Sequence, residues 1–509
     1  MKPTFTRSRL FRSLLALALG GALLPATAAE TGAPACRYTE VASLPLHYTG
    51  PGLAVTAEGS INGNPATLLV DTGAFDTVLA TTPVERYKLA LTETGRKSQG
   101  IGGEAKIYMA QIDELSVGPA KSGRSRVRVL TDFGHPPSYD AIIGAPFLLQ
   151  TDMEIALATK ELRFFRPSNC NDRFLAYWDA AAMEIPFEQS SPRDPNPRFT
   201  VLVNGKKMKA VIDTGAATTL IGLNAARRAG LKLDTPGVKR QGEASGIGNA
   251  RAAKWNTSFD TFQIGTETVK NAEIGVVDWE GSVDILLGDD FLRAHRVLFA
   301  MSQRKLYISY VGGEPFGQRD RLEPWIQQEA DAGNGDAQMV LAGMYNAGRG
   351  VAQDRALGAS WLEKAARGGN PQANIRTGRE LMRKGFPEDG AARLRSALEK
   401  LPSNRLAALW LYQARVRSKQ PELAKTELAA HFAGNKDNAW PGPIADFYLG
   451  KITEEDLLKQ AGAEAATAKA RTCQSLAEMM EWYQAHGNRE RFEALLPQRK
   501  AACSAPPRG

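Results

Sequence analysis

Residues 67–80, Thr-Leu-Leu-Val-Asp-Thr-Gly-Ala-Phe-Asp-Thr-Val-Leu-Ala, place the carboxylate of Asp71 in a turn between two apolar runs. Residues 209–222, Lys-Ala-Val-Ile-Asp-Thr-Gly-Ala-Ala-Thr-Thr-Leu-Ile-Gly, repeat the pattern around Asp213. Asp and Gly both favour turns, so one copy would predict only a strand followed by a turn. Average residue usage gives Asp-Thr-Gly on the order of 0.1 times in a chain of this length. Two copies in one setting therefore indicate a duplication.

The duplication extends well beyond the two aspartates. Hairpin-type Asn-Gly turns precede both Asp-bearing strands, and glycine-rich and apolar-apolar-Gly segments follow them. Four landmarks recur in the same order, with offsets of 142 to 146 residues: Ile61-Asn62-Gly63 and Val203-Asn204-Gly205, Asp71 and Asp213, Gly100-Ile101-Gly102 and Gly246-Ile247-Gly248, and Ile142-Ile143-Gly144 and Leu286-Leu287-Gly288. We predict one β-rich unit used twice, at residues 37–168 and 180–311.

The composition sets the frame for these units. A chain of 509 residues has room for about three domains, and a hydrophobic content of 43% supports buried cores. Residues 1–28 contain four basic residues and no acidic one, so their removal lowers the formal net charge from +8 to +4. The remaining basic residues are spread out and form no recognised nucleic-acid motif. We therefore expect no nucleic-acid partner.

The N-terminus predicts a secretory signal peptide at residues 1–28. Lys2, Arg7, Arg9 and Arg12 precede an apolar run at residues 14–24, and small residues follow at 25–29. This run is too short to span a membrane, although a membrane anchor is the alternative. We expect export across the inner membrane, with the bacterial periplasm preferred over the outside, and no membrane span after the signal peptide is removed.

The cysteines predict disulfides rather than a metal site. The four cysteines form no Cys-x-x-Cys pair, and the five histidines are scattered, so we expect no metal and no cofactor. An even number of cysteines in an oxidising compartment favours disulfides, and buried free thiols are the alternative. The order of the predicted domains suggests the pairs Cys36–Cys170 and Cys473–Cys503.

Helical periodicity replaces β-type alternation after about residue 310. Leu362-Glu-Lys recurs as Leu398-Glu-Lys, 36 residues later, and such a period is typical of helical-hairpin repeats. The segment 345–351, Tyr-Asn-Ala-Gly-Arg-Gly-Val, resembles the Sel-like repeat, a relative of the tetratricopeptide repeat. We predict repeats at 320–435 and a C-terminal helical segment at 436–509.

The resemblance to these repeats implies that the region binds a protein partner. A stabilising appendage is the alternative. We expect removal of residues 320–509 to leave cleavage of short peptides intact.

The duplicated aspartates fit amide hydrolysis without a metal. This reaction needs a base to activate water and an acid to protonate the departing nitrogen. Two carboxylates at short range share one proton, so Asp71 and Asp213 can supply both functions. The hydroxyls of Thr72 and Thr214 can hydrogen-bond across to the opposite loop. Glycine after each threonine, at Gly73 and Gly215, permits a tight turn and a close backbone approach.

These segments resemble the retroviral-type aspartic proteases. Residues 68–79 are similar to their catalytic loop, Gly100-Ile101-Gly102 to their flap, and Ile142-Ile143-Gly144 to the segment packed behind the loop. The resemblance covers roughly residues 40 to 311 and recurs in the second unit. It implies a closed β-barrel-like fold for each half. It also implies catalytic aspartates at Asp71 and Asp213, and a peptide held between them and the flaps.

The resemblance also assigns the remaining residues of the motifs. Gly100, Ile101 and Gly102, and likewise Gly246, Ile247 and Gly248, would form flap tips that close over substrate. Gly144 and Gly288 would have a structural function. Because one chain carries both loops, as in pepsin-like enzymes, a monomer would suffice for activity.

This sequence departs from the family pattern at several positions. Phe75 stands where the family often has an acidic residue paired with an arginine, and Ala145 and Asp289 stand where that arginine would be. Asp76 has Thr218 as its counterpart, so the two ends of the cleft should differ. Pepsin-like enzymes commonly carry a hydroxyl residue after Asp-Thr-Gly that favours the ionised carboxylate, whereas this chain has alanine in both copies. The loss of that donor raises a carboxylate pKa, which predicts a working pH that is mildly acidic to neutral.

The sequence thus predicts an exported aspartic endopeptidase that acts on peptide or protein substrates, with helical repeats for partner or substrate binding. A catalytically silent peptide-binding or envelope assembly module is the first alternative. A scaffold in which the aspartates are merely turn residues is the second, but it would not explain the paired glycine-tipped hairpins.

Overall fold

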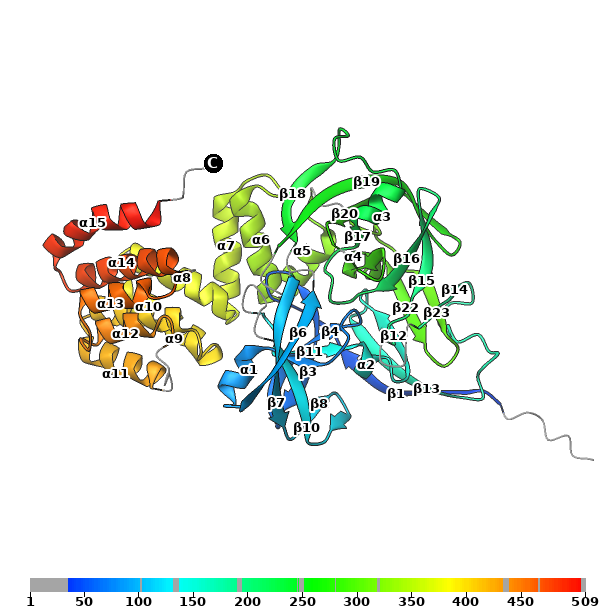
Figure 1. Cartoon of the computed structure of the whole chain (residues 1–509), viewed down its shortest axis with the longest axis horizontal. Helices are drawn as coiled ribbons and strands as arrows, with labels where there is room; N and C mark the ends of the chain where they lie inside the picture. Colours follow the sequence, from blue (N-terminus) through cyan, green and yellow to red (C-terminus); the bar gives the residue numbers. More distant parts are fainter. Residues whose placement is uncertain are drawn as a thin grey trace, which may run out of the picture.

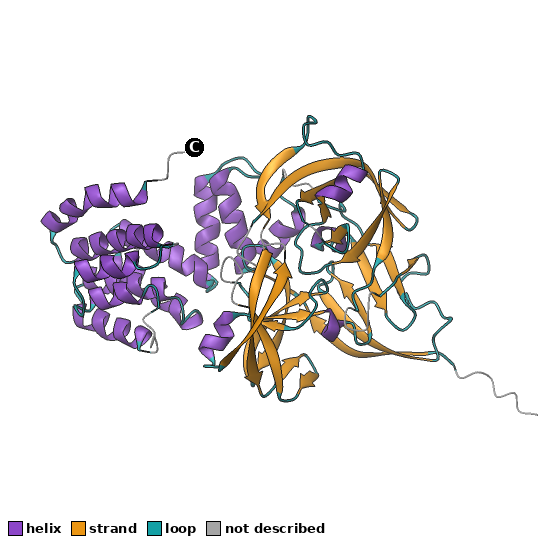
Figure 2. Ribbon diagram, in the orientation of Figure 1, coloured by secondary structure: helices purple, strands orange, loops and turns teal. Residues whose placement is uncertain are grey.

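The computed structural model describes residues 35–100, 103–130, 137–189, 195–244, 246, 251–279, 281–317, 321–433, 439–465 and 467–504. The signal peptide expected at residues 1–28 lies outside this range. Strands form the first part of the chain, and helices form nearly all of the remainder (Figure 2). The prediction of a mainly β region followed by an all-α region is therefore confirmed.

The first β-lobe contains the strands that carry the first set of landmarks. Asn62 and Gly63 both adopt a positive φ, as a two-residue hairpin turn requires, and the strands on either side pair with Ile61 opposite Asn64. The elements of this lobe are β1 (Arg37–Pro45), β2 (His47–Thr49), β3 (Ala54–Ile61), β4 (Asn64–Asp71), β5 (Val78–Leu79), α1 (Thr81–Arg86), β6 (Leu91–Gly100), β7 (Gly103–Ile112), β8 (Leu115–Val117), β9 (Ala120–Ser122), β10 (Ser125–Leu130), β11 (Ala141–Gly144), α2 (Ala145–Leu148), β12 (Asp152–Ala156) and β13 (Glu161–Ser168).

The second β-lobe repeats this plan. Asn204 and Gly205 again adopt a positive φ in a two-residue turn, with Val203 opposite Lys206. Its elements are β14 (Met183–Pro186), β15 (Phe199–Val203), β16 (Lys206–Ile212), β17 (Leu220–Gly222), α3 (Leu223–Arg228), β18 (Lys239–Ala244), β19 (Ala252–Ile264), β20 (Glu267–Val277), β21 (Ile285–Leu287), α4 (Asp289–Leu292), β22 (His295–Ala300) and β23 (Lys305–Tyr310).

A shared sheet joins the lobes. Within the described residues its order is β1-β13-β12-β22-β23-β14, so each lobe contributes three strands and the seam is the antiparallel pair β12–β22. At this seam Glu154, which is buried, accepts a hydrogen bond from Nε of Arg296 at 2.9 Å. The first and last strands of each lobe therefore belong to one sheet that both lobes share.

Each lobe also has its own sheet around an apolar-apolar-Gly strand. In the first lobe β11 lies between β4 and β5, parallel to β4, and Gly144 is opposite Asp71. In the second lobe β21 lies between β16 and β17, with Ile212 opposite Leu287. The residues of β11 are all buried, as a central strand with covered faces requires.

Two disulfides are formed in the structure, Cys36–Cys170 and Cys473–Cys503. The first ties the start of β1 to the segment after β13. The second joins the last two helices of the chain. The thiols expected to pair thus do so within the described residues.

The helical region consists mainly of consecutive antiparallel pairs. Asn334, Asn370 and Asn404 each accept a hydrogen bond from a backbone N–H in the first turn of a helix, which explains why an Asn-x-x-Ala segment recurs in the sequence. The helices are α5 (Pro324–Asp331), α6 (Gly335–Ala347), α7 (Arg355–Arg367), α8 (Pro371–Arg383), α9 (Pro387–Lys400), α10 (Arg405–Arg417), α11 (Pro421–Phe432), α12 (Gly442–Tyr448), α13 (Glu454–Gly462), α14 (Ala468–Ala485) and α15 (Arg489–Cys503).

The first helices share their core with the β-lobes. Leu341 of α6 and Trp361 of α7 belong to the same buried cluster as the lobe residues, whereas the helices from α8 onward form a second cluster. Polar contacts reinforce this join: Asn334 donates to the Tyr48 carbonyl at 2.9 Å, and Asp336 accepts from the Gly50 N–H at 2.7 Å. Figure 1 shows α5, α6 and α7 against the lobes, with α8–α15 farther out.

Packing therefore divides residues 320–509, because α5–α7 share the core of the lobes and the later helices form their own. The separation in packing falls near α8, because only the later helices bury their apolar faces against one another.

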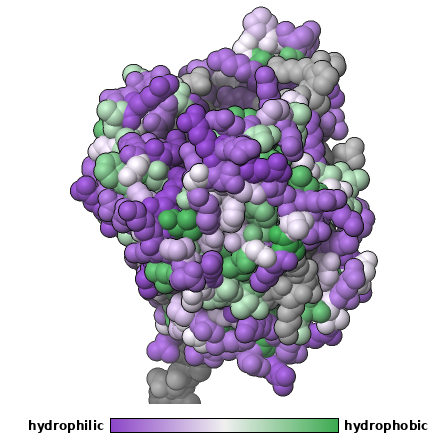
Figure 3. Space-filling model, turned by 90° about the vertical axis from the view of Figure 1, so that its left-hand side faces the viewer, coloured by the Kyte–Doolittle hydropathy of each residue, from purple (hydrophilic) through white to green (hydrophobic). Residues whose placement is uncertain are grey.

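The surface of the helical end is largely hydrophilic (Figure 3). The large apolar side chains exposed in this region come from separate segments: Leu357, Phe386, Leu423 and Leu496. Within the described part of the chain, no helix has the length and apolar character needed to cross a membrane.

Candidate active site

The two Asp-Thr-Gly loops meet face to face at the junction of the lobes. Asp71 ends β4, and Asp213 directly follows β16. Each aspartate accepts a hydrogen bond from its own loop, because the Ala74 N–H donates to Asp71 Oδ1 at 2.9 Å and the Gly215 N–H donates to Asp213 Oδ1 at 3.0 Å. The site is therefore composed of two copies of one local structure.

Reciprocal hydrogen bonds from the threonines hold the two loops together. The Thr72 hydroxyl donates to the Ile212 carbonyl at 2.7 Å and accepts from the Thr214 N–H at 3.2 Å. The Thr214 hydroxyl donates to the Val70 carbonyl at 2.6 Å and accepts from the Thr72 N–H at 3.0 Å. Both threonines are buried, so these four bonds satisfy groups that water cannot reach.

The glycines of both loops allow each aspartate to contact the opposite loop. A Cβ atom added at Gly73 would lie 2.4 Å from Asp213 Oδ1, and one added at Gly215 would lie 2.4 Å from Asp71 Cγ. Only a residue without a side chain leaves room for the carboxyl group there. The glycines predicted to permit a close approach thus pack directly against the aspartates.

Gly144 and Gly288 lie behind the loops. A Cβ atom at Gly144 would lie 2.4 Å from the Asp76 carbonyl oxygen, and one at Gly288 would lie 2.5 Å from that of Ala216. The next residues anchor the loops from behind, since the N–H groups of Ala145 and Asp289 donate to the carbonyls of Ala74 and Ala216. The structure therefore places both glycines in tight backbone packing.

The environment of the aspartates favours a shared proton. Burial raises the pKa of Asp71 well above its usual range, and the charge of Asp213 and a hydrogen bond to it raise it further. Burial also raises the pKa of Asp213, while the Gly215 N–H and a hydrogen bond from Asp71 oppose the rise. One proton held between two carboxyl groups is the arrangement in which one acts as acid and the other as base.

The expected flaps are antiparallel hairpins. Strands β6 and β7 pair up to Gly100 opposite Gly103, and β18 pairs with β19 in the second lobe. Gly100 and Gly246 are described. The other flap residues predicted from the sequence, Ile101, Gly102, Ile247 and Gly248, lie outside the described residues.

An Arg–Asp pair in each lobe was missed in the sequence. Asp140 lies 3.4 Å from Arg86 of α1 and accepts from the Thr67 N–H at 3.0 Å. In the second lobe Arg228 of α3 pairs with Asp284, which accepts from the Lys209 N–H at 2.9 Å. The arginines lie 142 residues apart and the aspartates 144, which matches the period of the duplication, so the sequence did contain a signal for these pairs. In each lobe the aspartate of this pair thus connects the strand that leads into the catalytic loop with the helix that follows the loop.

The two sides of the cleft differ in charge and size. Phe75 is 62% exposed in the first loop, and Asp76 lies 3.0 Å from Arg128 Nε. The second loop has Ala217 and Thr218 at these positions. Strand register aligns Arg128 with Val78 and Gly275 with Leu220, so glycine replaces the arginine in the second lobe. The expected asymmetry therefore includes an ion pair that only the first lobe has.

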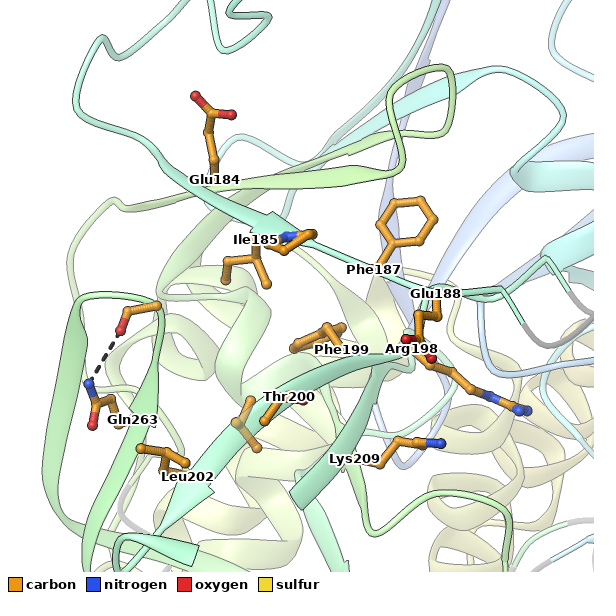
Figure 4. A pocket seen from close by; sticks show the side chains of 13 residues that line it. Glu184, Ile185, Phe187, Glu188, Arg198, Phe199, Thr200, Leu202, Lys209 and Gln263 are labelled. Carbon is orange, nitrogen blue, oxygen red and sulfur yellow. Dashed lines mark hydrogen bonds between the residues drawn. The ribbon is translucent and has the colours of Figure 1, made fainter. Parts of the chain in front are cut away.

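A cavity of about 540 Å³ lies elsewhere in the second lobe (Figure 4). It is lined by residues 184–188 and 198–202, among others, and the Gln263 side chain donates to the Gly265 carbonyl at its edge. Its lining residues include neither Asp-Thr-Gly loop nor the described flap residues Gly100 and Gly246, so we do not assign it to the site. Among the described residues, no cluster of three or more His, Cys, Asp or Glu side chains is placed to hold a metal ion.

Comparisons with known proteins match both lobes to proteases. Residues 57–147 match a family described as "Aspartyl protease", and residues 199–294 match one described as "gag-polyprotein putative aspartyl protease". Among solved structures, an aspartic proteinase from Irpex lacteus matches with a TM-score of 0.33 and 13% identity, over 54% of this chain and 97% of that one. No curated protein sequence matches significantly. The two family matches, one in each lobe, confirm the resemblance to retropepsin-like aspartic proteases.

Proposed function

We propose that this chain, whose paired β-lobes are those of an aspartic-type peptidase, is an exported single-chain endopeptidase that uses Asp71 and Asp213 as its catalytic pair. The contact between the two aspartates carries the proposal. Each carboxyl group packs on the glycine of the opposite loop, and one chain supplies both. A dimer is not needed to complete the site.

The reaction follows from the shared proton. The ionised carboxylate accepts a proton from a water molecule, whose oxygen attacks the peptide carbonyl carbon. The protonated carboxyl group donates its proton to the carbonyl oxygen, which gives a tetrahedral diol. In the collapse of the diol, the carboxyl group that took the proton from water donates it to the nitrogen, one diol hydroxyl returns its proton to the other carboxylate, and the C–N bond breaks to give a carboxylic acid and an amine; the dyad again holds one proton. Thr72 and Thr214 fix the loops, and the two hairpins cover the substrate.

Export is part of the proposal. A signal peptide at residues 1–28 is the first support, and the disulfides Cys36–Cys170 and Cys473–Cys503 are the second, because disulfides persist in oxidising compartments. We favour the bacterial periplasm as the destination.

The Sel-like, tetratricopeptide-like repeats predicted at residues 320–435 are proposed to bind the substrate protein or a partner, and the outer helices from α8 onward are the part that packs apart from the lobes. Their separate core supports this function, since α8–α15 bury their apolar faces without the lobes. Their exposed surface is mainly polar, so the partner would be held by hydrogen bonds and ion pairs more than by an apolar groove.

A mixed-peptide library incubated with the chain from residue 29 onward tests the proposal. We expect cleavage products that are absent from a sample of the Asp71→Asn variant. Saturable peptide binding without cleavage by the unmodified chain would favour the peptide-binding alternative, and the absence of both would leave only the scaffold.

A further inference from the structure

The cavity of about 540 Å³ in the second lobe lies between the edges of two strands. Strand β14 is the last strand of the shared sheet, and β15 belongs to the sheet of the second lobe. The backbones of Glu188 and Arg198 exchange two hydrogen bonds of 2.8 Å, and from this bridge the two strands diverge (Figure 4). The cavity is therefore a slot that is closed at one end and has a strand edge on either side.

The edge of β15 directs backbone groups into this slot. A two-residue turn makes Val203 and Lys206 a hydrogen-bonded pair of strands β15 and β16. Because the direction of bonding alternates along an antiparallel strand, Thr200 points its N–H and C=O away from β16. Strand β19 pairs with this second edge only at Leu202 and Val203. Thr200 therefore presents a backbone donor and a backbone acceptor to the slot.

The edge of β14 faces the slot in the same way. The Phe187 N–H donates to the Arg304 carbonyl at 3.1 Å, on the side of β23, and the next residue, Glu188, turns its N–H the other way into the bridge. By the same alternation Pro186 and Glu184 face the slot. Pro186 offers only its carbonyl, whereas Glu184 offers a donor and an acceptor. No described strand pairs with this edge of β14.

The two strands also supply an apolar floor. The side chains of Ile185, Phe187, Phe199 and Val201 line the cavity and are buried. A volume of about 540 Å³ lies within the range of about 300 to 1,000 Å³ that is typical of ligand sites. Backbone groups on both edges favour an extended peptide over a compact small molecule, because a peptide strand can bond along a strand edge.

Lys209 places a positive charge at the slot that the fold does not require. It lies opposite Thr200 in register, so the two side chains share the outer face. Its counterpart in the first lobe, 142 residues earlier, is Thr67. The backbone serves the same purpose in both, because the Lys209 N–H donates to Asp284 at 2.9 Å and the Thr67 N–H donates to Asp140 at 3.0 Å. The lysine side chain therefore needs another explanation.

The other charged side chains of the slot occur beside a group of opposite sign. Glu184 lies 2.6 Å from Lys305, and Glu188 is the cross-strand neighbour of Arg198. Lys209 makes no ion pair within 4.0 Å in the described part of the chain. The slot thus carries one cation in excess, which favours a ligand with a carboxylate.

We propose that this slot is a second peptide-binding site, in which an extended segment adds as a strand between β14 and β15 and places an acidic side chain against Lys209. The slot runs along residues 184–187 of β14, so about four residues of the ligand lie within it. Successive side chains of an added strand point to opposite faces, so one set meets the apolar floor and the other meets Lys209. The site goes beyond the proposed function, because it contains neither catalytic loop.

Binding is tested on the Asp71→Asn/Asp213→Asn form of the chain from residue 29 onward, so that peptides stay intact. The probes are three pools of octapeptides with mixed sequence and a fixed central Glu, Gln or Lys. Hydrogen–deuterium exchange is measured in residues 183–188 and 198–203, where an added strand bonds to the backbone. We expect the Glu pool to slow exchange in both segments and the Lys pool to leave them unchanged. Protection confined to the catalytic loops and hairpins, with none in these two segments, would overturn the proposal.

Lys209→Glu tests the charge, and Lys207→Glu is the matched control. Lys207 is exposed two residues earlier on β16 and does not line the cavity. Lys209→Glu should weaken binding of the Glu pool by roughly tenfold, because an attraction becomes a repulsion, whereas Lys207→Glu should change it little. Equal weakening by both variants would show that only the overall charge matters and would overturn the role of Lys209.

Cleavage separates this inference from the proposed function. With both catalytic aspartates restored, Lys209→Glu should cleave short peptides at the rate of the unmodified chain, since the slot is not part of the catalytic site. A matching loss of cleavage and binding in this variant would show a folding defect or a single shared site and would overturn the proposal of a second site. If the unmodified chain cleaves nothing, the proposed function fails, and the exchange experiment still decides whether the slot binds peptides.

Discussion

The threonine hydroxyls at the junction of the catalytic loops allow a prediction with a worked magnitude. Substitution of Thr72 by Val keeps the shape of the side chain but removes the hydroxyl that bonds to the Ile212 carbonyl and the Thr214 N–H. Both groups are then left unsatisfied in a buried place, at about 1–3 kcal/mol each. We expect Thr72→Val to destabilise the β-lobes by about 2–6 kcal/mol.

Thr72→Ser is the matched control. Serine keeps both hydrogen bonds and loses one methyl group, which costs about 1 kcal/mol. The hydroxyl rather than the side-chain volume would then account for the difference between the two variants. Because the loops carry the dyad, the Val variant should also lose peptide cleavage more strongly than the Ser variant.

The assay must resolve the lobes from the separate core of α8–α15, since a chain with several cores need not unfold in one step. Hydrogen–deuterium exchange of peptides covering residues 64–74 and 206–216 reports on both loops at once. We expect Thr72→Val to speed exchange in both segments, because each loop is held by the other. Equal exchange and equal cleavage in the Val and Ser variants would show that the hydroxyl does not join the lobes.

Three further predictions follow from the site and the packing. Gly73→Ala places a Cβ atom 2.4 Å from Asp213 Oδ1 and should lower kcat/KM for peptide cleavage by a factor on the order of 100 or more. Gly123→Ala is the control and should change little, because an added Cβ atom there has no atom within 4 Å. Equal rates in the two variants would refute the packing argument. The raised pKa values of both aspartates predict a cleavage maximum at mildly acidic to neutral pH, and a rate maximum near pH 2 would contradict this. The same raised values should make the folded state lose stability as the pH rises above about 4. Removal of residues 370–509 should spare cleavage of short peptides. Removal of residues 318–509 should abolish this cleavage, because it also takes Trp325, Leu341 and Trp361 from the core shared with the lobes. Retained cleavage in the shorter chain would show that α5–α7 are dispensable.

Much of the β region could be predicted because its information is local. The Asn-Gly turns, the Asp-Thr-Gly loops and the apolar-apolar-Gly strands each depend on a few adjacent residues, and the duplication repeats each of them. The cross-loop hydrogen bonds of Thr72 and Thr214 also followed, because two identical loops related by symmetry can satisfy each other.

Features that depend on distant residues were harder to predict. The sequence around Trp325 and Trp361 predicts helices but carries no sign of the lobe surface that they cover, so the shared core was not predicted. The burial of Asp289 was not predicted either, because its sequence position shows only a departure from the family pattern. The pairing of the two lobes at β12–β22 leaves no local signal either.

A mutant cycle on the dyad tests the central claim most directly. The rate of cleavage of one peptide is measured at the optimal pH for the unmodified chain, Asp71→Asn, Asp213→Asn and the double variant, with the fold of each checked by circular dichroism. If the two carboxyl groups work as one unit with a shared proton, each single variant should lose a factor on the order of 10³ or more, and the double variant should lose no more than either. Substantial activity in one single variant, or losses that multiply in the double variant, would contradict a shared-proton dyad.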